Sequence, residues 1–366
     1  MTATLDPAAR HEERRDALAG RLGEVLIASM DLQCIYLGER LGLYQALREG
    51  GPATANDLAT RAGIDARYAR EWLEQQAGAG ILDVDDVTAD ADARRYALPS
   101  GHAEVLLDER SPYLLGPVTR FVVGMSHRLP DLMEAYRTGA GIDWADYGPD
   151  VIEAQEALNR PHFEHYLPEW VAALPDVAAR LAAGARVADI GCGTGWSSIW
   201  FARHYPATRV DGIDIDPGSL VRARARAEHE GVADRVRFLD AAETAAADGA
   251  GTYDLVAIFE ALHDMADPIG VLRIARGLLA PGGVVLIADE RTAATFNVDP
   301  ESSDRMFYGF SVLGCLPNGR FGATSAATGT VIRAETVERY AREAGFSGVT
   351  VLPTEHGQFR FYRLDP

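Results

Sequence analysis

The sequence predicts an α/β fold: a doubly wound parallel sheet that ends in an antiparallel hairpin and is preceded by a mostly helical domain. The first observation is that short apolar segments of strand length alternate with helical segments from residue 185 onward. The second is a glycine-rich turn directly after the first of these strands. The third is that only five residues separate the last two strands, 349–352 and 358–364. Five residues are too few for a parallel crossover, so these two strands must pair antiparallel.

The remaining elements of this part follow in order. Strands are expected at 186–190, 209–213, 235–239, 253–259 and 284–288, and helices at 196–204, 217–230, 267–279 and 334–344. Helices between such strands act as crossovers, which makes the strands parallel. The expected organisation is a helical domain at 1–110, a helical linker at 111–180 that lines the active site, and the sheet domain at 181–366.

The amino-terminal domain begins with an apolar stripe. Its members recur at helical spacing: Leu18, Leu22, Val25, Leu26, Ser29, Leu32 and Ile35. Such a stripe is either an ordinary core face or the face of a dimerisation helix. The spacing alone favours neither interpretation.

Residues 51–99 have the pattern of a winged helix. Thr54 and Asp65 are expected to cap two helices, Gly63 to end the first of them, and two short strands to follow at 81–84 and 95–98. A winged helix can bind DNA, but residues 41–100 carry six arginines against ten carboxylates. Phosphate groups would repel such a surface. We therefore expect a packing and dimerisation module.

Composition excludes several classes of function. The net charge is −19 and all 35 cationic side chains are arginine. Without lysine, neither a P-loop nor a Schiff-base enzyme is possible. The acidic balance disfavours nucleic acid and anionic membranes as partners. The three cysteines lie far apart, which predicts no metal centre and a reducing, cytoplasmic setting. No signal-peptide core and no membrane-spanning run is expected either.

The glycine-rich turn points to a nucleoside ligand with a cationic group. Strand 186–190 runs into Gly191-Cys192-Gly193-Thr194-Gly195, and these small residues let a ligand approach the backbone at a helix terminus. The spacing G-x-G-x-G differs from the G-x-G-x-x-G of dinucleotide enzymes. The carboxylate of Asp189, just before the turn, is poorly placed for a pyrophosphate and suits an amino group.

Two further acids end the next two strands. Asp214 follows Gly195 by nineteen positions and can accept both hydroxyl groups of a ribose. Asp240, with Ala241, ends the third strand and can accept an adenine amine. Asp216 is expected instead to cap the helix that begins at 217. Asp189, Asp214 and Asp240 thus lie at the edge where ligands of doubly wound sheets bind.

These motifs resemble a known family. The run VADIGCGTG, with Asp214, Asp240, YDLVAIFEALHD and LAPGGVVLIAD, resembles the Rossmann-like class I S-adenosylmethionine-dependent methyltransferases over about residues 180–366. With the winged helix and the segments DRMFYGFSVLGCLP, SAATGTVIR and FRFYRL, residues 20–366 resemble a bacterial small-molecule subfamily. The resemblance implies S-adenosyl-L-methionine as cofactor. The cofactor-side residues that it implies are Asp189, Gly191, Cys192, Gly193, Gly195, Asp214, Ile215, Asp240, Ala241 and Glu260.

Three side chains are the catalytic candidates. His263 lies in A-L-H-D-M-A-D, which is similar to the L-H-D-W-x-D of plant-type O-methyltransferases, whose histidine is the general base; Met265 replaces the tryptophan. An imidazole is suited to deprotonating a phenol or an acid. The alternative is that His263 caps or packs at a loop. His162 and Tyr166 share a helix face that either lines the pocket or packs between domains.

Residues 291–330 interrupt the alternation and predict a lid over the sheet edge. The segment is rich in apolar side chains: Met306, Phe307, Tyr308, Phe310 and Leu313. These favour a hydrophobic or aromatic acceptor. The alternative is that the segment only packs on the helical domain.

The features together predict a homodimeric methyltransferase of secondary metabolism that acts on a small molecule, with O-methylation favoured. Three alternatives stay open. They are a cofactor-binding sensor or cyclase that does not methylate, a winged-helix regulator of DNA, and a nicotinamide dehydrogenase. The acidic wing disfavours the regulator, and the glycine spacing disfavours the dehydrogenase.

Overall fold

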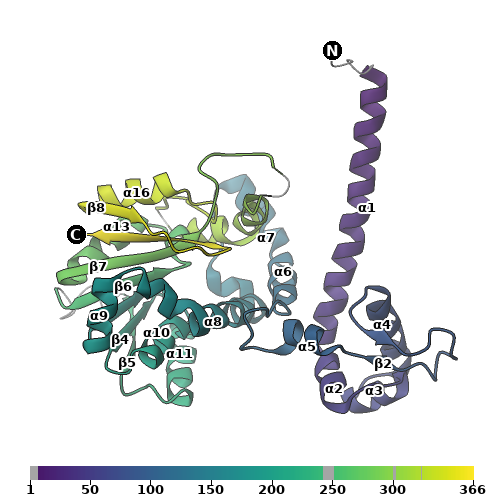
Figure 1. Ribbon diagram of the computed structural model, residues 1–366. Helices are drawn as coiled ribbons and strands as arrows, with labels where there is room; N and C mark the ends of the chain where they lie inside the picture. Colours follow the sequence, from purple (N-terminus) through teal and green to yellow (C-terminus); the bar gives the residue numbers. More distant parts are fainter. Residues whose placement is uncertain (1–6, 242–250, 300–301, 323) are drawn as a thin grey trace. The chain divides into compact units, whose positions relative to one another are not determined.

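The computed structural model of the 366-residue chain describes residues 7–241, 251–299, 302–322 and 324–366 (Figure 1). It divides into two compact units, Met1–Val123 and Gly124–Pro366, which we describe separately. The second unit contains both the sheet and the segment 124–180. The finer division into three parts stays a prediction.

The first unit has the elements of a winged helix. They are α1 (Pro7–Arg40), α2 (Leu43–Gly50), α3 (Ala55–Ala62), α4 (Ala66–Gly78), β1 (Asp83–Val84), β2 (Tyr96–Ala97) and α5 (Ser100–Leu107). Helix α6 (Val118–Ser126) crosses the boundary between the units. The predicted caps are confirmed: Thr54 forms a capping box with Asp57, Asp65 accepts two backbone N–H groups, and Gly63 ends α3 at φ 68°.

Only the carboxyl-terminal part of α1 packs on the rest of this unit. Trp72 of α4 donates to the carbonyl of Cys34, and Gln75 donates to Asp31. The amino-terminal part of the predicted stripe is exposed, at 57% for Leu18 and 58% for Leu22. That part of the stripe is therefore not a core face within this unit. The interpretation as a dimerisation face stays a prediction.

The second unit is built on a seven-stranded sheet with the order β5-β4-β3-β6-β7-β9-β8. Its strands are β3 (Arg186–Ile190), β4 (Arg209–Asp214), β5 (Val236–Asp240), β6 (Tyr253–Phe259), β7 (Leu279–Glu290), β8 (Gly348–Val351) and β9 (Phe359–Asp365). The first five run parallel, and β9 pairs antiparallel with both β7 and β8. The predicted doubly wound sheet with a terminal hairpin is confirmed. Its order reverses beside β3, where ligands of such sheets bind.

Helices cover both faces of this sheet (Figure 1). One core contains residues of α8 (Gly148–Ala172), α9 (Pro175–Ala183), α10 (Trp196–His204) and α11 (Pro217–His229). The opposite core contains residues of α13 (Pro268–Leu278) and α16 (Ala334–Glu343). The other elements are α7 (Leu129–Thr138), η1 (Trp144–Tyr147), η2 (Leu262–Asp264), α14 (Asp304–Phe310), the π-helix η3 (Ser311–Cys315) and α15 (Leu316–Gly319).

Strand β7 is longer than its apolar pattern predicts. We expected it to end at residue 288, but it continues through Asp289 and Glu290, which pair with Arg360 and Phe359 of β9. The antiparallel partner supplies hydrogen bonds beyond the end of the apolar run. Two acids are thereby held in a strand at the functional edge. Among the described residues, no helix has the length and hydropathy needed to cross a membrane.

Candidate functional site

The glycine-rich turn is closely packed between β3 and α10. Gly191, Gly193 and Gly195 have φ values of 74°, 52° and 87°, a region that side chains disfavour. A Cβ on Gly195 would lie 2.5 Å from the Phe238 ring, whereas a Cβ on Gly193 would meet nothing within 4 Å. The turn is therefore fixed on its inner side and open at Gly193. A ligand can approach the backbone there.

Asp214, the last residue of β4, holds this turn in place. Its Oδ2 accepts the Gly193 N–H at 2.7 Å, and its Oδ1 accepts the Asp216 N–H at 2.9 Å. Burial raises the pKa of the Asp214 carboxyl above its usual value. Asp216 caps α11 by accepting the N–H groups of Gly218 and Ser219, which confirms the role predicted for it.

Asp189 is buried beneath the turn, at 1% exposure. Its Oδ2 accepts hydrogen bonds from the hydroxyls of Ser197 and Ser198 in the first turn of α10, at 2.5 and 2.6 Å. Burial raises the pKa of Asp189 to about 6, although the two hydroxyls act in the opposite direction. Sequence reasoning missed this serine pair. The signal was present, since two hydroxyls open the helix that follows the turn.

The remaining predicted cofactor residues lie along the same sheet edge. Asp240 ends β5 directly opposite Asp214 of β4, and Ala241 follows it, partly buried. Ile215 is 83% exposed, while Cys192 is 7% exposed and burial raises the pKa of its thiol. The structure thus gathers these residues at the carboxyl ends of β3, β4 and β5, and Glu260 follows the neighbouring strand β6. Residues 242–250, which follow Ala241, lie outside the described part of the chain.

Glu260 follows β6 in an unusual backbone conformation. Its φ of 47° is left-handed, which costs about 1–2 kcal/mol for a residue with a side chain. Gln155 Nε2 of α8 lies 3.5 Å from Glu260 Oε2, and Asn159, one turn further along α8, hydrogen bonds to the same carboxyl. Burial raises the pKa of Glu260 to about 7. The backbone conformation directs an otherwise costly buried carboxyl toward α8.

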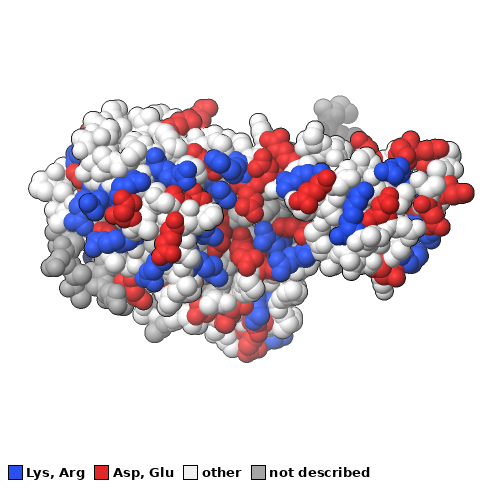
Figure 2. Space-filling view, turned by 90° about the horizontal axis from the view of Figure 1, so that it is seen from below, with Lys and Arg blue, Asp and Glu red and all other residues white. Residues whose placement is uncertain are grey.

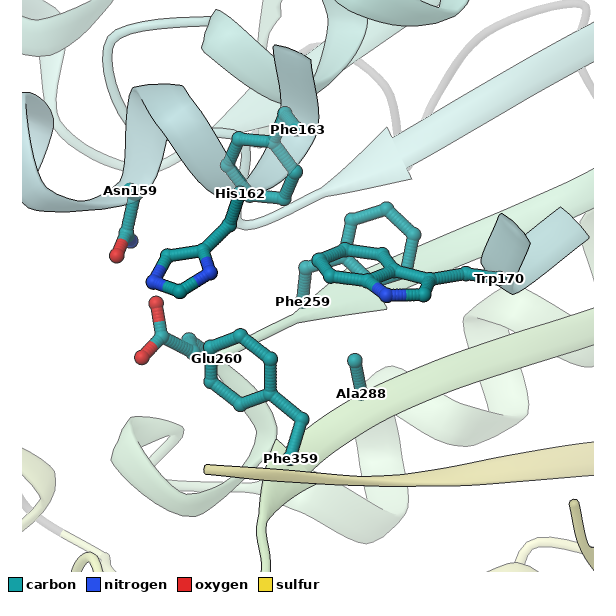
Figure 3. Close-up of a pocket in the computed structure, with 8 residues that line it drawn as sticks. All are labelled: Asn159, His162, Phe163, Trp170, Phe259, Glu260, Ala288 and Phe359. Atoms are coloured by element: carbon teal, nitrogen blue, oxygen red, sulfur yellow. The ribbon is translucent and has the colours of Figure 1, made fainter. Parts of the chain in front are cut away.

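A small aromatic pocket surrounds this carboxyl (Figure 3). The residues that line it are Asn159, His162, Phe163, Trp170, Phe259, Glu260, Ala288 and Phe359. Figure 3 shows the carboxyl of Glu260 pointing toward Asn159 and His162, with the aromatic rings on the other side. The pocket therefore combines a polar end with an apolar wall, and its side chains fill it so closely that no water-sized space remains.

His162 and Tyr166 lie together, as their spacing predicts. Their ring centroids are 6.2 Å apart, and His162 also contacts His356 and Phe359 at 5.2 and 5.6 Å. Burial, and then the nearby His356, lower the pKa of His162 to about 4, so its ring is neutral at pH 7. Its Nδ1 has no hydrogen-bond partner among the described residues. In the neutral ring, that nitrogen can accept a hydrogen bond when the proton is on Nε2.

His263, in η2, is surrounded by carboxylates. Its Nδ1 lies 2.7 Å from Asp289 Oδ1 and 3.0 Å from Glu290 Oε2, and its Nε2 lies 3.4 Å from Asp264 Oδ1. Although burial acts to lower it, the pKa of His263 is raised well above its usual value by Glu290, Asp264 and Asp289. Sequence reasoning found His263 but missed Asp289 and Glu290.

The pKa values of the two acids of β7 shift in opposite directions. Burial raises the pKa of both carboxyls, but at Asp289 the charge of His263 and the hydrogen bonds from Glu290 and His263 together outweigh burial, so the net direction is downward. At Glu290 the upward effect of burial prevails, and its pKa is well above normal. A charged pair of His263 and Asp289 beside a protonated Glu290 is consistent with both directions.

The predicted lid segment contacts this cluster. The N–H of Gly329 donates to the carbonyl of His263 at 3.2 Å, and the ligand atoms of Cys315, Asp264 and His263 lie within 4.8 Å of one another. Tyr147 donates to the carbonyl of Leu313 within the π-helix. Residues 300, 301 and 323 of the predicted segment lie outside the described residues. Closure of this segment as a lid stays a prediction.

The same cluster contains groups that metals bind. His263, Asp289 and Glu290 offer ligand atoms within 4.8 Å of one another, and so do His263, Asp264 and Cys315. The sequence predicted no metal.

Family comparisons agree with the architecture. A methyltransferase-domain model matches residues 188–285, and an Rv2258c-like winged HTH domain model matches residues 29–107. The ubiquinone biosynthesis O-methyltransferase of Pseudomonas aeruginosa is 32% identical over 186 residues, 48% of this chain and 72% of that protein. The enzyme of that name from Xanthomonas axonopodis pv. citri is 38% identical over 122 residues, 33% of this chain and 50% of its own. The chain spans about half the length, or less, of the first curated relatives it matches.

Solved structures share the fold across the whole chain. The mitomycin 7-O-methyltransferase MmcR has a TM-score of 0.69 at 22% identity, with 97% of this chain and 99% of that chain covered. Human N-acetylserotonin methyltransferase, solved in complex with S-adenosylmethionine, has a TM-score of 0.65 at 19% identity, with 100% and 99% covered. At these identities the likeness concerns the fold.

Proposed function

The chain belongs to the class I S-adenosylmethionine-dependent methyltransferases with an amino-terminal winged helix, and we propose that it methylates an oxygen of a small, hydrophobic or aromatic acceptor. The observation that carries this proposal is the position of His263. It lies directly beyond β6, at the same sheet edge as the carboxylates that end β3, β4 and β5.

The residues at this edge fit the cofactor by their chemistry. Asp214 would accept the ribose hydroxyls, Asp240 the adenine amine, and Asp189 would supply negative charge near the methionine amino group. The open side of Gly193 leaves room for a ligand against the backbone. When bound, S-adenosylmethionine supplies an electrophilic methyl group on a sulfonium. Holding the acceptor in line with that methyl group could lower the barrier by about 7–11 kcal/mol.

His263 would act as the general base. Its Nδ1–H would donate to Asp289, and Nε2, which lies 3.4 Å from Asp264 Oδ1, would take the proton of the acceptor hydroxyl as the new O–CH₃ bond forms. Because the carboxylates raise its pKa, the neutral base form becomes abundant only in alkaline solution. Turnover should therefore rise with pH above neutrality.

The aromatic surroundings support an aromatic acceptor. His162 is neutral and its Nδ1 is unpartnered among the described residues, so it could accept a hydrogen bond from an acceptor hydroxyl. Tyr166 lies beside it, and the ring of Phe359, which is 4% exposed, packs against His162. We include His162 and Tyr166 in the proposed acceptor side.

The proposal includes a homodimer that does not bind nucleic acid. The exposed apolar residues of α1, such as Leu22 and Leu26, form a surface that a second copy would cover. On the face in Figure 2, the described arginines are interspersed with acidic side chains rather than gathered in one basic surface. The free state of the cysteines is consistent with a reducing, cytoplasmic setting.

Calorimetry and a product assay test the function. We expect S-adenosylhomocysteine to bind and NAD⁺ not to bind, and S-adenosylhomocysteine to accumulate when S-adenosylmethionine is supplied with phenolic acceptors. Amine and thiol analogues of each phenol test the preference for oxygen. Binding without product from any acceptor would favour the non-methylating alternative. Failure to bind S-adenosylhomocysteine would refute the proposal.

A further inference from the structure

Helix α8 is connected to the glycine-rich turn by a chain of polar contacts. Glu156 Oε2 of α8 accepts a hydrogen bond from Arg226 Nη2 of α11 at 2.8 Å. The Nη1 of the same guanidinium donates to the carbonyl of Thr194 at 2.8 Å, within the turn itself. One arginine thus joins a carboxylate on α8 to the backbone expected to bind the cofactor. Only a guanidinium offers two rigid donors at this spacing.

A second contact holds the residue that follows the turn. Trp196, at the start of α10, has the guanidinium of Arg160 at 4.4 Å and that of Arg226 at 4.6 Å from its ring centroid. The tryptophan is 8% exposed, so these cation–π contacts are largely shielded from water. Arg160 lies one helical turn after Glu156, so both act from the same face of α8.

The contacts between Glu156 and Arg226 are largely buried, which strengthens their electrostatic attraction. The side chains of Glu156 and Arg226 are 11% and 20% exposed, and salt screens such partly buried pairs less than surface pairs. Glu156 has a second partner, Arg222, whose Nε lies 3.3 Å from Oε1. Arg222 is 37% exposed, and the structure gives it no bond to the turn. It therefore offers a matched control for the same carboxylate.

Two residues on the adjacent face of α8 contact the segment that follows β6. Gln155 and Asn159 contact the carboxyl of Glu260, as described above. Helix α8 therefore contacts Glu260, which follows β6, and is linked through Arg226 to the turn that follows β3. Its position can affect how the turn meets a ligand.

We propose that Glu156 is a positioning residue for the cofactor, which acts through Arg226 to hold the Thr194 carbonyl and the glycine-rich turn in the binding conformation. The inference rests on the proposed function, because it takes S-adenosylmethionine as the ligand of the turn. Glu156 itself contacts neither the turn nor the reacting groups.

The experiment compares Glu156→Gln with Arg222→Gln in the full-length chain. Glu156→Gln should weaken S-adenosylhomocysteine binding in calorimetry by about tenfold and raise KM for S-adenosylmethionine equally, with kcat at saturation within about twofold. Arg222→Gln should leave the dissociation constant and KM within about twofold of wild type. Arg226→Lys keeps the charge but cannot bridge two acceptors, and should resemble Glu156→Gln. The double variant Glu156→Gln/Arg226→Lys should bind S-adenosylhomocysteine no more weakly than either of its single variants.

Three outcomes would overturn the role proposed for Glu156. Unchanged affinity in Glu156→Gln, or an equal loss in Arg222→Gln, would overturn the inference, as would a lower thermal midpoint with normal affinity. If Glu156→Gln does not fold, Arg226→Lys carries the same comparison. Wild-type protein that fails to bind S-adenosylhomocysteine would instead refute the proposed function. The two failures are therefore distinguishable.

Discussion

At the ends of β3 and β4, neutral donors hold each buried carboxylate, whereas at the ends of β6 and β7 several carboxylates surround a single imidazole. Asp189 is bound by two serine hydroxyls and Asp214 by two backbone N–H groups. His263 instead lies among Asp264, Asp289 and Glu290. Both regions belong to the same sheet edge.

The difference separates binding from proton transfer. Neutral donors stabilise a negative charge without cancelling it, so the first region can still attract a cationic ligand. In the second region charges shift one another's pKa values, and the protons belong to the cluster rather than to one residue. Perturbed clusters of this kind are typical of catalytic sites. We therefore expect substitutions in the two regions to change different kinetic constants.

The largest expected effect is that of His263→Ala. Loss of the proposed base should lower kcat by about 10²–10⁴-fold, because the acceptor hydroxyl then loses its proton unassisted. The dissociation constant of S-adenosylhomocysteine should not change. Turnover within a few-fold of wild type would leave His263 only its alternative role of packing at the loop. His165→Ala, at an exposed position, serves as a histidine control.

Asp289→Asn should produce a smaller loss together with a shift in pH dependence. An amide still orients the ring, so kcat at the optimum should fall by at most about 10²-fold. Because the Asp289 charge helps to raise the pKa of His263, its removal should move the rise of the kcat–pH profile toward lower pH. A shift toward higher pH would contradict the proposed pair, and Asp240→Asn provides a matched change outside the cluster.

Asp214→Asn should have the smallest of the three effects on turnover. It removes the charge that accepts the ribose hydroxyls, so S-adenosylhomocysteine should bind about tenfold more weakly. The kcat at saturating cofactor should stay within about twofold of wild type. A large fall in kcat with unchanged affinity would erase the distinction between the two regions. Asp216→Asn, which alters a helix cap instead, is the control.

Local patterns accounted for most of the fold and for the first region. The turn, Asp189 and Asp214 lie within one βαβ unit, where strand and helix lengths determine which residues meet. The second region depends on distant pairing. Asp289 reaches His263 only because β7 lies beside β6 and β9 extends it past its apolar run. Asp289 and Glu290 directly follow the predicted strand 284–288, and acids in that position had identified Asp214 and Asp240 as site residues. The position of Asp289 and Glu290 was therefore a usable signal for a functional role.

The sequence by itself determined the parallel sheet, its terminal hairpin, the winged-helix caps and the position of the glycine-rich turn. These follow from apolar periodicity and from residues whose preferences act over a few positions. Tertiary structure alone decided the raised pKa of His263, the left-handed backbone of Glu260 and the link from Glu156 to Thr194. Each depends on side chains brought together from elements far apart in the chain, and on burial, which removes the water that would otherwise screen their charges.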